Sequence, residues 1–271
     1  MKYSILMTVY KNDNRDYFRE ALLSVVDQTL KADEIVIVKD GPITEELQKV
    51  IDQVSSENLN LIKEVQLEKN VGLGLALNRG IDNCSNELIA RMDADDISMK
   101  YRCQRLVEAF ERNPDLDIVG SPVIEFIDDI TNVVGQRNVP LNNEDIHKFN
   151  RTRDPFNHPA VMYRKSKVLD AGMYSDLRKN QDTDLWIKML SRGAICANVA
   201  EPLLYFRFDK NTYKKRKNWT NTKLLIGIRW KAYKNGYCSF LDFLKVAGMQ
   251  TCIYIMPSKF QELVYKKLLR R

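Results

Sequence analysis

The sequence of 271 residues lacks several features that would assign it to a well-marked class. Its five cysteines lie far apart and form no Cys-x-x-Cys pair, so neither a zinc site nor a disulfide framework is indicated. No uninterrupted apolar run reaches the length of about 18 residues that a membrane-spanning helix needs. The N-terminus runs directly into the strand-like segment YSILMTV and not into a secretory signal. We therefore expect a cytoplasmic protein.

Glycine is missing at the place where many nucleotide-binding folds need it. The segment MTVYKNDNRD, which contains the turn after the first predicted strand, has no glycine. In KNVGLGLALNRG, the pattern Gly-x-Gly-x-x-Gly fails because Leu77 stands at the last position. A nicotinamide cofactor is therefore disfavoured.

The charge of the chain is unevenly distributed, although its net value is only +6. From Lys210 to the C-terminus there are 15 lysines and arginines but 2 acidic residues, so this segment carries +13 and the first 209 residues carry −7. Such an asymmetry is typical of an acidic or neutral catalytic body joined to a basic tail that meets an anionic surface.

The N-terminal part of the chain alternates between short apolar runs and segments with helical periodicity. Strands are predicted at residues 3–9, 34–39, 61–66 and 87–92. Helices are predicted between them at residues 15–28, 44–54 and 74–84. This alternation predicts an α/β fold with a mainly parallel sheet covered on both faces, in which ligands bind at the carboxyl ends of the strands.

The regularity weakens after residue 98. Helices are predicted at residues 101–112, 143–150 and 183–191. Strands are predicted at residues 118–120, 123–126, 132–136, 160–164, 195–199 and 203–208. These strands are expected to be mixed in direction. Because the chain shows no internal repeat and no low-complexity linker, residues 1–209 are interpreted as one continuous domain in two halves.

Three carboxylates stand within four residues at Asp93, Asp95 and Asp96, directly after the strand predicted at residues 87–92. They repel one another unless a cation balances them. Mg²⁺ or Mn²⁺ is suitable, because such ions prefer oxygen ligands and are commonly held by carboxylates together with substrate phosphates. The alternative is a solvated loop in which Asp96 caps the next helix. The position at the carboxyl end of a buried strand favours the metal site.

Six segments occur in the order found in the inverting glycosyltransferases of family 2, and the chain resembles this family over residues 3–209. The segments are SILMTVYKND, EIVIVKDGP, LEKNVGLGLALNRGI, ELIARMDADDIS, NHPAVMYRKS and QDTDLWIKML. The chain looks particularly like bacterial members that build capsule, exopolysaccharide or O-antigen units. The resemblance implies a GT-A fold with a Rossmann-like sheet: a nucleotide-sugar half at residues 1–98, an acceptor half at 99–209, and basic amphipathic helices at 210–271.

The resemblance also implies which residues hold a UDP-sugar donor. Those expected to border the donor are Thr8, Val9, Tyr10, Asp40, Lys69, Asn70, Gly72, Arg79, Asp93, Ala94, Asp95 and His158. Asp40 is expected to bond the uracil, although Asp-Gly-Pro alone is equally typical of a turn. Gly72 allows the backbone to approach a ligand closely, and a helix that begins here offers N–H groups to phosphate. Arg79 is expected near the phosphates, whereas Asn78 is equally well explained as a helix residue without a ligand.

An inverting transfer needs one carboxylate that takes the proton from the acceptor hydroxyl. The family places this base in a Glu-Asp pair at the start of a helix, and the matching pair here is Gln181-Asp182. Asp182 is therefore the expected base. Gln181 removes a neighbouring charge that would raise the pKa of this base. Asp184 is the competing candidate, and a capped, acidic helix start is the alternative reading for it.

Two further residues are assigned by the resemblance. His158 matches a position near the acceptor and the donor sugar, although a lone histidine is as often structural. Asp209 ends LYFRFD, where many relatives carry a histidine that can reach the metal. An aspartate also binds hard cations, so Asp209 is expected to join Asp93 and Asp95 as a metal ligand.

From Trp219 onward, aromatic and aliphatic residues are interleaved with lysine and arginine. Amphipathic helices of this composition suit a membrane interface, and here the inner face of the cytoplasmic membrane is expected. Such contact also suits an acceptor that is carried on a polyprenyl diphosphate. The alternatives are helices that pack on the core or on a second subunit of a homodimer. Nucleic acid binding is disfavoured because nothing in the rest of the chain supports it.

The sequence thus predicts an inverting, metal-dependent glycosyltransferase at the membrane that makes a bacterial surface polysaccharide. It is expected to transfer a hexose or an N-acetylhexosamine from a UDP-sugar to a hydroxyl group of a lipid-linked glycan. A nucleotidyltransferase acting on sugar phosphates needs a glycine- and lysine-rich loop after the first strand, which is missing. A non-enzymatic, membrane-associated binding protein leaves the clustered aspartates without a purpose.

Overall fold

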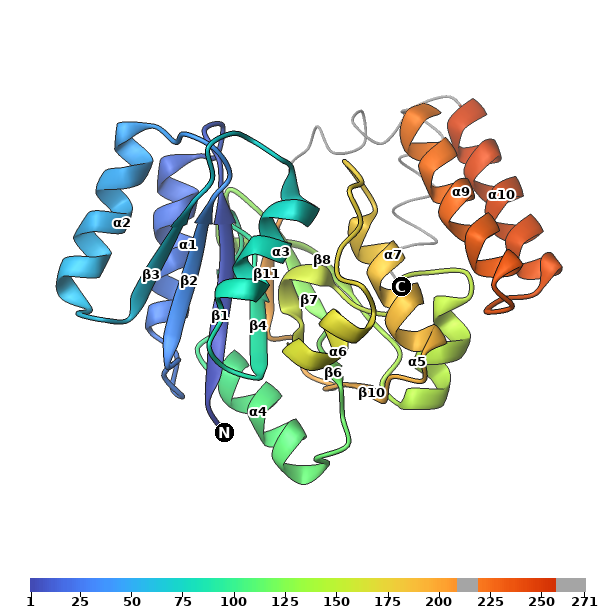
Figure 1. Ribbon diagram of the computed structural model, residues 1–271, viewed down its shortest axis with the longest axis horizontal. Helices are drawn as coiled ribbons and strands as arrows, with labels where there is room; N and C mark the ends of the chain where they lie inside the picture. The colour runs from blue at the N-terminus through green and yellow to red at the C-terminus, as the bar shows by residue number, and fades with distance from the viewer. Residues whose placement is uncertain (209–218, 257–271) are drawn as a thin grey trace.

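The computed structural model describes residues 1–208 and 219–256 (Figure 1). Its N-terminal part consists of β1 (Tyr3–Val9), α1 (Arg15–Val26), β2 (Glu34–Lys39), α2 (Glu45–Glu57), β3 (Ile62–Gln66), α3 (Leu73–Asn83) and β4 (Leu88–Met92). The predicted alternation of strands and helices is confirmed. Two of the helices begin at side-chain caps, because Asn14 accepts hydrogen bonds from the backbone of α1 and Thr44 accepts one from the backbone of α2.

The second part begins with β5 (Ile97–Ser98), α4 (Arg102–Arg112), β6 (Ile118–Gly120), β7 (Val123–Ile127), β8 (Asp129–Arg137) and α5 (Asn143–Asn150). It continues with the 3-10 helix η1 (His158–Ala160), β9 (Met162–Arg164), α6 (Lys165–Asp170), α7 (Gln181–Ser191), β10 (Cys196–Asn198) and β11 (Leu204–Arg207). The short elements β5, η1 and α6 have no counterpart among the predicted segments. They contain two, three and six residues, which is too few to show a clear period.

The strands form two sheets. The main sheet has the order β10-β6-β9-β4-β1-β2-β3, and β4, β1, β2 and β3 within it are parallel. The strand β9 runs antiparallel to its neighbours and lies between β4 and β6. A smaller sheet has the order β5-β11-β7-β8 and contains both parallel and antiparallel pairs. The prediction of a mainly parallel sheet followed by a mixed half is therefore confirmed.

The main sheet separates two apolar cores. Alternate residues of β1 point to opposite faces, so that Ile5 and Met7 belong to one core and Leu6 to the other. The first core also contains side chains from α1, α2 and α4, while the second contains side chains from α3, α5 and α7. Because both faces are covered, β4 is buried along its whole length, and its residues are apolar except for the buried Arg91.

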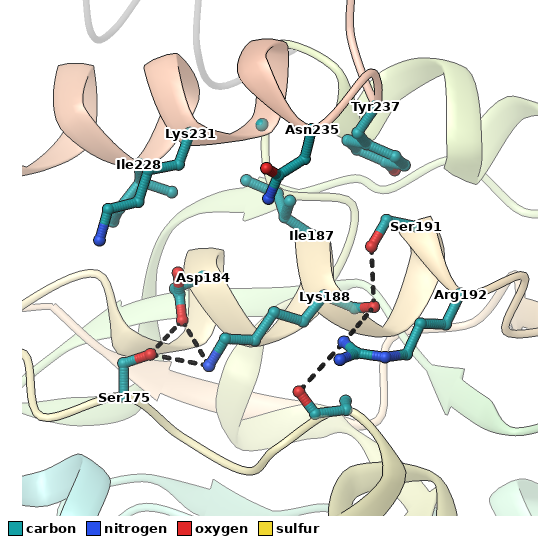
Figure 2. A pocket seen from close by; sticks show the side chains of 12 residues that line it. Ser175, Asp184, Ile187, Lys188, Ser191, Arg192, Ile228, Lys231, Asn235 and Tyr237 are labelled. Atoms are coloured by element: carbon teal, nitrogen blue, oxygen red, sulfur yellow. Dashed lines mark hydrogen bonds and ion pairs between the residues drawn. The ribbon is translucent and has the colours of Figure 1, made fainter.

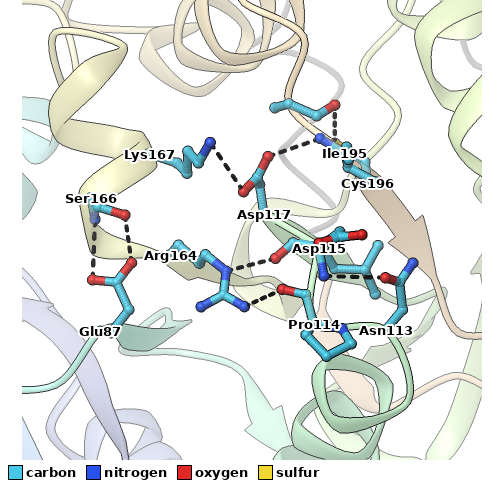
Figure 3. Close-up of polar contacts among 12 residues, drawn as sticks. Glu87, Asn113, Pro114, Asp115, Asp117, Arg164, Ser166, Lys167, Ile195 and Cys196 are labelled. Atoms are coloured by element: carbon cyan, nitrogen blue, oxygen red, sulfur yellow. Dashed lines mark hydrogen bonds and ion pairs between the residues drawn. The ribbon is translucent and has the colours of Figure 1, made fainter.

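Polar contacts close the edge of the sheet where β4, β6 and β10 begin (Figure 3). Arg164 at the end of β9 donates hydrogen bonds to the backbone oxygens of Leu116 (2.8 Å) and Pro114 (2.6 Å). Asp117 accepts a hydrogen bond from the backbone N–H of Ile195 (2.9 Å), which joins the starts of β6 and β10. These contacts lie at the amino ends of the parallel strands and leave the carboxyl ends free for a ligand.

A helical hairpin of α9 (Trp219–Lys234) and α10 (Phe240–Ile255) follows the two sheets and lies beside α7 (Figure 1). A capping box at Ser239 and Asp242 starts α10. The hairpin meets α7 through a small apolar cluster, whereas α10 packs mainly on α9 and exposes Phe240, Leu241 and Leu244. No helix in residues 1–208 and 219–256 combines the length and the hydropathy needed to cross a bilayer.

Candidate active site

The parallel strands β1, β2 and β4 end at the same edge of the main sheet. Val9 of β1 lies beside Lys39 of β2, and Met7 of β1 lies beside Met92 of β4. The ends of these strands and the segments after them carry the predicted donor residues Thr8, Val9, Tyr10, Asp40, Asp93, Ala94 and Asp95. The tertiary structure therefore brings this group of residues to one edge, as parallel pairing requires.

Asp40 is buried and organises the loop after β3. Its Oδ1 accepts a hydrogen bond from the backbone N–H of Val71 (2.7 Å). Its Oδ2 accepts one from the side-chain amide of Asn70 (2.8 Å) and one from the backbone N–H of Gly72 (3.1 Å). An ionised carboxylate has about four acceptor positions, so about one remains for a donor group of a ligand. Asp40 is thus the anchor of the loop and not only a turn residue.

Two glycines allow the loop and the turn to approach each other. Gly41 and Gly72 have φ angles of +85° and +94°, which glycine adopts readily. A Cβ atom on Gly41 would lie 2.6 Å from the backbone nitrogen of Asn70, and one on Gly72 would lie 3.0 Å from Nη1 of Arg178. The same Nη1 donates a hydrogen bond to Oδ1 of Asn70 (3.3 Å). Arg178, a cation far along the chain, therefore lies against the loop before α3.

The acidic run forms a tight cluster, in which Asp93, Asp95 and Asp96 bring carboxylate oxygens within 4.8 Å of one another. Asp93 forms an ion pair with the buried Arg91. Asp95 is exposed, but the protein atoms around it displace water, and this desolvation together with the charge of Asp93 raises its pKa to about 6. Burial and the charges of its two neighbours raise the pKa of Asp96 well above its ordinary range.

The alternative interpretation, in which Asp96 caps the next helix, is wrong. The element after it is β5, and α4 begins only after its N-cap residue Tyr101. Asp96 is 1% exposed, and its Oδ1 accepts a hydrogen bond from the backbone N–H of Arg207 in β11 (2.9 Å). The Nε atom of Arg207 also donates to the backbone oxygen of Asp95 (2.9 Å). Asp96 therefore fastens the acidic run to the smaller sheet.

The donor atoms of this cluster fit a hard divalent cation, since all are carboxylate oxygens. Oδ2 of Asp96 is buried and has no hydrogen-bond partner among the described residues, so the cluster has acceptor capacity to spare. The predicted third ligand, Asp209, lies outside the described residues. Of the three predicted metal ligands, Asp93 and Asp95 are the two that lie within the described residues, and both belong to this cluster.

The expected base, Asp182, is the second residue of α7 and is half-buried. Burial, followed by the negative charge of Asp154, raises its pKa to about 6, while a hydrogen bond from the backbone of Thr183 and the charge of Arg91 act in the opposite direction. A carboxylate with this pKa is ionised at pH 7 and is close enough to the working pH to take a proton efficiently.

The competing base, Asp184, lies in a different environment. Its carboxylate accepts a hydrogen bond from Ser175 and forms an ion pair with Lys188 (2.8 Å). It lines a cavity of about 400 Å³ between α7 and α9 (Figure 2). Because both partners hold the carboxylate there, the geometry favours Asp182 over Asp184.

His158 is buried and held by protein groups. Its Nε2 forms a hydrogen bond with the hydroxyl group of Tyr174 (2.8 Å), and its ring packs against Trp186. Burial, followed by the charge of Arg91, lowers the pKa of His158 well below its ordinary value, so the imidazole is neutral at pH 7. His158 therefore packs as a neutral side chain close to Arg91, together with Tyr174 and Trp186.

The side chains of Lys69 and Arg79 are less constrained than those of the other predicted donor residues, although the backbone of Lys69 lies close to Gly41. Both are exposed, and Arg79 lies in the second turn of α3. Within the described residues, the side chain of Arg79 makes no hydrogen bond or ion pair with another site residue. Its neighbour Asn78 exchanges two hydrogen bonds with the backbone of Tyr174 (2.9 and 3.0 Å). Asn78 therefore joins α3 to the loop before α7, in agreement with its structural interpretation.

Arg91 is a site residue that the sequence motifs did not identify. It is 1% exposed, pairs with Asp93, and acts through its charge on Asp182, His158 and Tyr174. Its Nε and Nη1 atoms have no hydrogen-bond partner among the described residues. An arginine inside the apolar run ELIARM is a usable signal, since arginine is rarely buried without a partner or a role.

Asp13, Arg178 and Arg207 are also missing from the predicted site. Asp13 accepts a hydrogen bond from the backbone N–H of Tyr10 (2.9 Å), and burial together with the charges of the acidic run and of Asp40 raises its pKa to about 7. Only Asp13, four residues after the predicted strand, offered a local signal. Arg178 and Arg207 reach the site through contacts between distant parts of the chain.

The chain belongs to glycosyl transferase family 2, whose sequence pattern matches residues 4–172. It is 35% identical over 270 residues to the UDP-Gal:alpha-D-GlcNAc-diphosphoundecaprenol beta-1,3-galactosyltransferase of Escherichia coli, and the match covers 100% of this chain and 97% of the relative. It is also 35% identical to the amylovoran biosynthesis glycosyltransferase AmsE of Erwinia amylovora, with 98% of each chain covered. The protein is therefore a glycosyltransferase, and the nucleotidyltransferase and non-enzymatic alternatives are set aside.

Solved structures agree on the fold. The mannosyltransferase PcManGT from Pyrobaculum calidifontis, in complex with GDP-Man and Mn²⁺, has a TM-score of 0.66 and 13% identity, with 96% of this chain and 71% of that chain covered. TarS 1-349 of S. aureus, in complex with UDP-GlcNAc, has a TM-score of 0.61 and 17% identity, with 99% and 86% covered. The predicted GT-A fold is confirmed.

Proposed function

We propose that the protein is an inverting transferase that moves a hexose or an N-acetylhexosamine from a UDP-sugar, with Asp182 as the base. The observation that carries this proposal is the position of Arg91. This buried cation pairs with Asp93 on one side, and on the other its charge opposes the rise in the pKa of Asp182 that burial and Asp154 cause. The acidic run after β4 and the base at the start of α7 therefore face one site.

The proposed donor pocket follows the edge of the main sheet. The end of β1 and the free acceptor position of Asp40 receive the uracil, whose ring N–H is a suitable donor. Helix α3 begins at Leu73 without a side-chain cap, so the N–H groups of its first turn are available to a phosphate. Arg178, which lies against Gly72, adds a positive charge beside these groups. Similarity to relatives named for UDP-sugars supports this donor class.

Asp93 and Asp95 would hold Mn²⁺ or Mg²⁺, which supplies positive charge for the departing diphosphate when it is bound. Asp182 accepts the proton of the acceptor hydroxyl while the hydroxyl oxygen forms a bond to the anomeric carbon. The bond between that carbon and the diphosphate oxygen breaks, and its electron pair leaves with UDP. Because attack comes from the face opposite the leaving group, the anomeric configuration inverts and an α-linked donor gives a β-linked product.

The proposed acceptor is a glycan carried on a polyprenyl diphosphate, since the Escherichia coli relative is named for an acceptor of this kind. The hairpin supports contact with the surface of a membrane, because α10 has only Asp242 and Lys245 as charged residues. Its exposed apolar side chains belong to the C-terminal segment from Lys210 onward, and the excess of lysine and arginine in the sequence of this segment attracts anionic lipid at about 1 kcal/mol per cation. We place the protein on the inner face of the cytoplasmic membrane in surface polysaccharide synthesis.

A panel of UDP-sugars tests the function. The full-length protein is incubated with each sugar, Mn²⁺ or Mg²⁺, and a synthetic GlcNAc diphosphate lipid, and the mass and linkage of the product are determined. A β-linked disaccharide from one donor is expected, and its formation should cease after chelation of the metal. An α-linked product, or equal turnover in the presence of the chelator, would contradict the mechanism.

A further inference from the structure

The C-terminal hairpin reaches the start of the catalytic helix through a buried cation. Arg229 of α9 is 2% exposed, and its Nη2 pairs with Oδ1 of Asp154 at 3.4 Å. Its Nη1 donates a hydrogen bond to the backbone oxygen of Asn150. The other oxygen of Asp154 accepts a hydrogen bond from the hydroxyl group of Thr183 (2.7 Å). Since Thr183 directly follows Asp182, a continuous polar chain links α9 to the proposed base.

Two further hydrogen bonds join the same parts of the molecule. The side-chain amide of Asn180 donates to Oδ1 of Asn221 in α9 (2.8 Å), and the hydroxyl group of Tyr237 donates to Oδ1 of Asn150 (2.9 Å). Asn180 precedes α7 and has a left-handed backbone with φ of 57°, which asparagine tolerates better than most residues. The hairpin thus holds the residue from which α7 starts.

The rest of the interface between α7 and α9 is loosely packed. Its apolar part is the small cluster of Ile187, Ile228, Ala232 and Cys238. Beside this cluster lies the cavity of about 400 Å³, across which Lys231 and Asn235 face the side of α7 that carries Lys188 and Arg192 (Figure 2). Because the cavity interrupts the packing, the polar contacts at the start of α7 make up much of the connection.

The charged groups that link α9 to Asp182 depend on one another. A buried guanidinium group is strongly unfavourable without an anion, so the position of α9 depends on Asp154. Asp154 itself is 38% exposed, and apart from burial its charge is the largest cause of the raised pKa of Asp182. Arg229 offsets that charge. Undocking of α9 therefore leaves Asp154 uncompensated next to the base.

We propose that Asp154 and Arg229 are positioning residues, through which the docked C-terminal hairpin sets the place and the electrostatic environment of the base. The inference rests on the proposed role of Asp182. Within residues 1–208 and 219–256, Arg91 from β4 and Tyr174 from the loop before α7 also interact with the charge of Asp182. Neither belongs to the hairpin, so changes at Arg229 act on the base through Asp154.

The test compares Arg229→Met, Asp154→Asn and their combination with the control Lys234→Met, which removes an exposed cation from the same helix. The dependence of kcat on pH is measured with a detergent-dispersed acceptor, so that membrane affinity plays no part. Arg229→Met is expected to lower kcat at pH 7 about tenfold, while KM for the donor stays within twofold. The acidic limb of the pH profile, where kcat rises as the base loses its proton, is expected to move to higher pH. Asp154→Asn keeps a hydrogen-bond partner for Thr183 and moves the limb to lower pH, alone and in the double variant.

Hydrogen–deuterium exchange provides a measurement that does not depend on turnover. Arg229→Met is expected to increase exchange at the backbone amides of residues 184–188, whereas Lys234→Met leaves it unchanged. Unchanged exchange in Arg229→Met overturns the inference, and so does an acidic limb that stays in place in both Arg229→Met and Asp154→Asn. If the limb moves in these variants but Asp182→Asn stays active, the proposed base is wrong and the coupling stands.

Discussion

Replacement of Asp182 by asparagine removes the proposed base and keeps the size of the side chain. A general base contributes about 10²- to 10⁴-fold to a rate, which corresponds to about 3 to 5 kcal/mol of activation free energy. We expect kcat to fall by this factor at pH 8, while the affinity for UDP in the presence of Mn²⁺ changes by less than about threefold. Initial rates with saturating donor and acceptor measure the first quantity, and isothermal titration calorimetry measures the second.

The pH dependence gives an independent check, because the pKa of Asp182 is raised to about 6. The base is active only when ionised, so kcat of the wild type should rise with pH, reach half of its maximum near pH 6 and level off above pH 7. A raised pKa also contributes stability that is complete below the ordinary value and is lost as the pH rises through about 6. Above pH 6 the wild type buries an ionised carboxylate at an energetic cost. Asp182→Asn removes this cost, so the Tm of the variant at pH 7.5 should equal or exceed that of the wild type.

Asp184→Asn is the matched control for Asp182→Asn, since it changes the same group two residues away on α7. Its carboxylate is held by Ser175 and Lys188 at the cavity and not at the site, so kcat should stay within about threefold of the wild type. The reasoning is refuted if Asp182→Asn keeps a tenth or more of the wild-type kcat, or if Asp184→Asn is the variant that loses activity.

Three further predictions concern the metal, the donor loop and the hairpin. Asp95→Asn should reduce kcat/KM on the order of 100-fold with Mn²⁺ and leave the circular dichroism spectrum unchanged; full activity would exclude Asp95 as a ligand. Gly41→Ala forces a strained backbone and a contact with Asn70, so chemical denaturation should show a loss of about 2 kcal/mol, and KM for the donor should rise; a neutral result would contradict the close approach. Joint replacement of Leu241 and Leu244 by glutamate should reduce binding to anionic vesicles at least tenfold, whereas unchanged binding, or a dimer that dissociates in the variant, would assign this surface to a second subunit.

Local patterns in the sequence were sufficient for the first half of the fold. The apolar runs and helical segments up to Met92 have lengths that show their periods clearly, and strand pairing between neighbours in a βαβ chain follows from the connections. Parallel pairing then places Asp40 and Asp93 at one edge without any further information. This is why the meeting of these residues at one edge was predictable, and why β5, η1 and α6, which are too short to show a period, were not.

The second half of the fold depended on contacts between residues that lie far apart in the chain. Arg207 bonds Asp96 across 111 residues, and Arg229 reaches Asp154 across 75. A segment rich in lysine and arginine is expected to be exposed, because its composition does not tell which single cation will be buried. Only the packing of α9 against α7 takes Arg229 out of water, and burial is what makes its partner obligatory.

The acidic run at Asp93, Asp95 and Asp96 also combines properties that the sequence determines with properties that the tertiary structure determines. Its three carboxylates and its place after a buried strand are properties of the sequence, and they were enough to indicate a cation site. The separate roles of its members arise from tertiary contacts: Arg91 pairs with Asp93, Asp95 stays open to solvent, and Asp96 is buried against β11. Adjacent residues of one type acquire different chemistry because each meets a different neighbour in space, and those neighbours are decided by the fold.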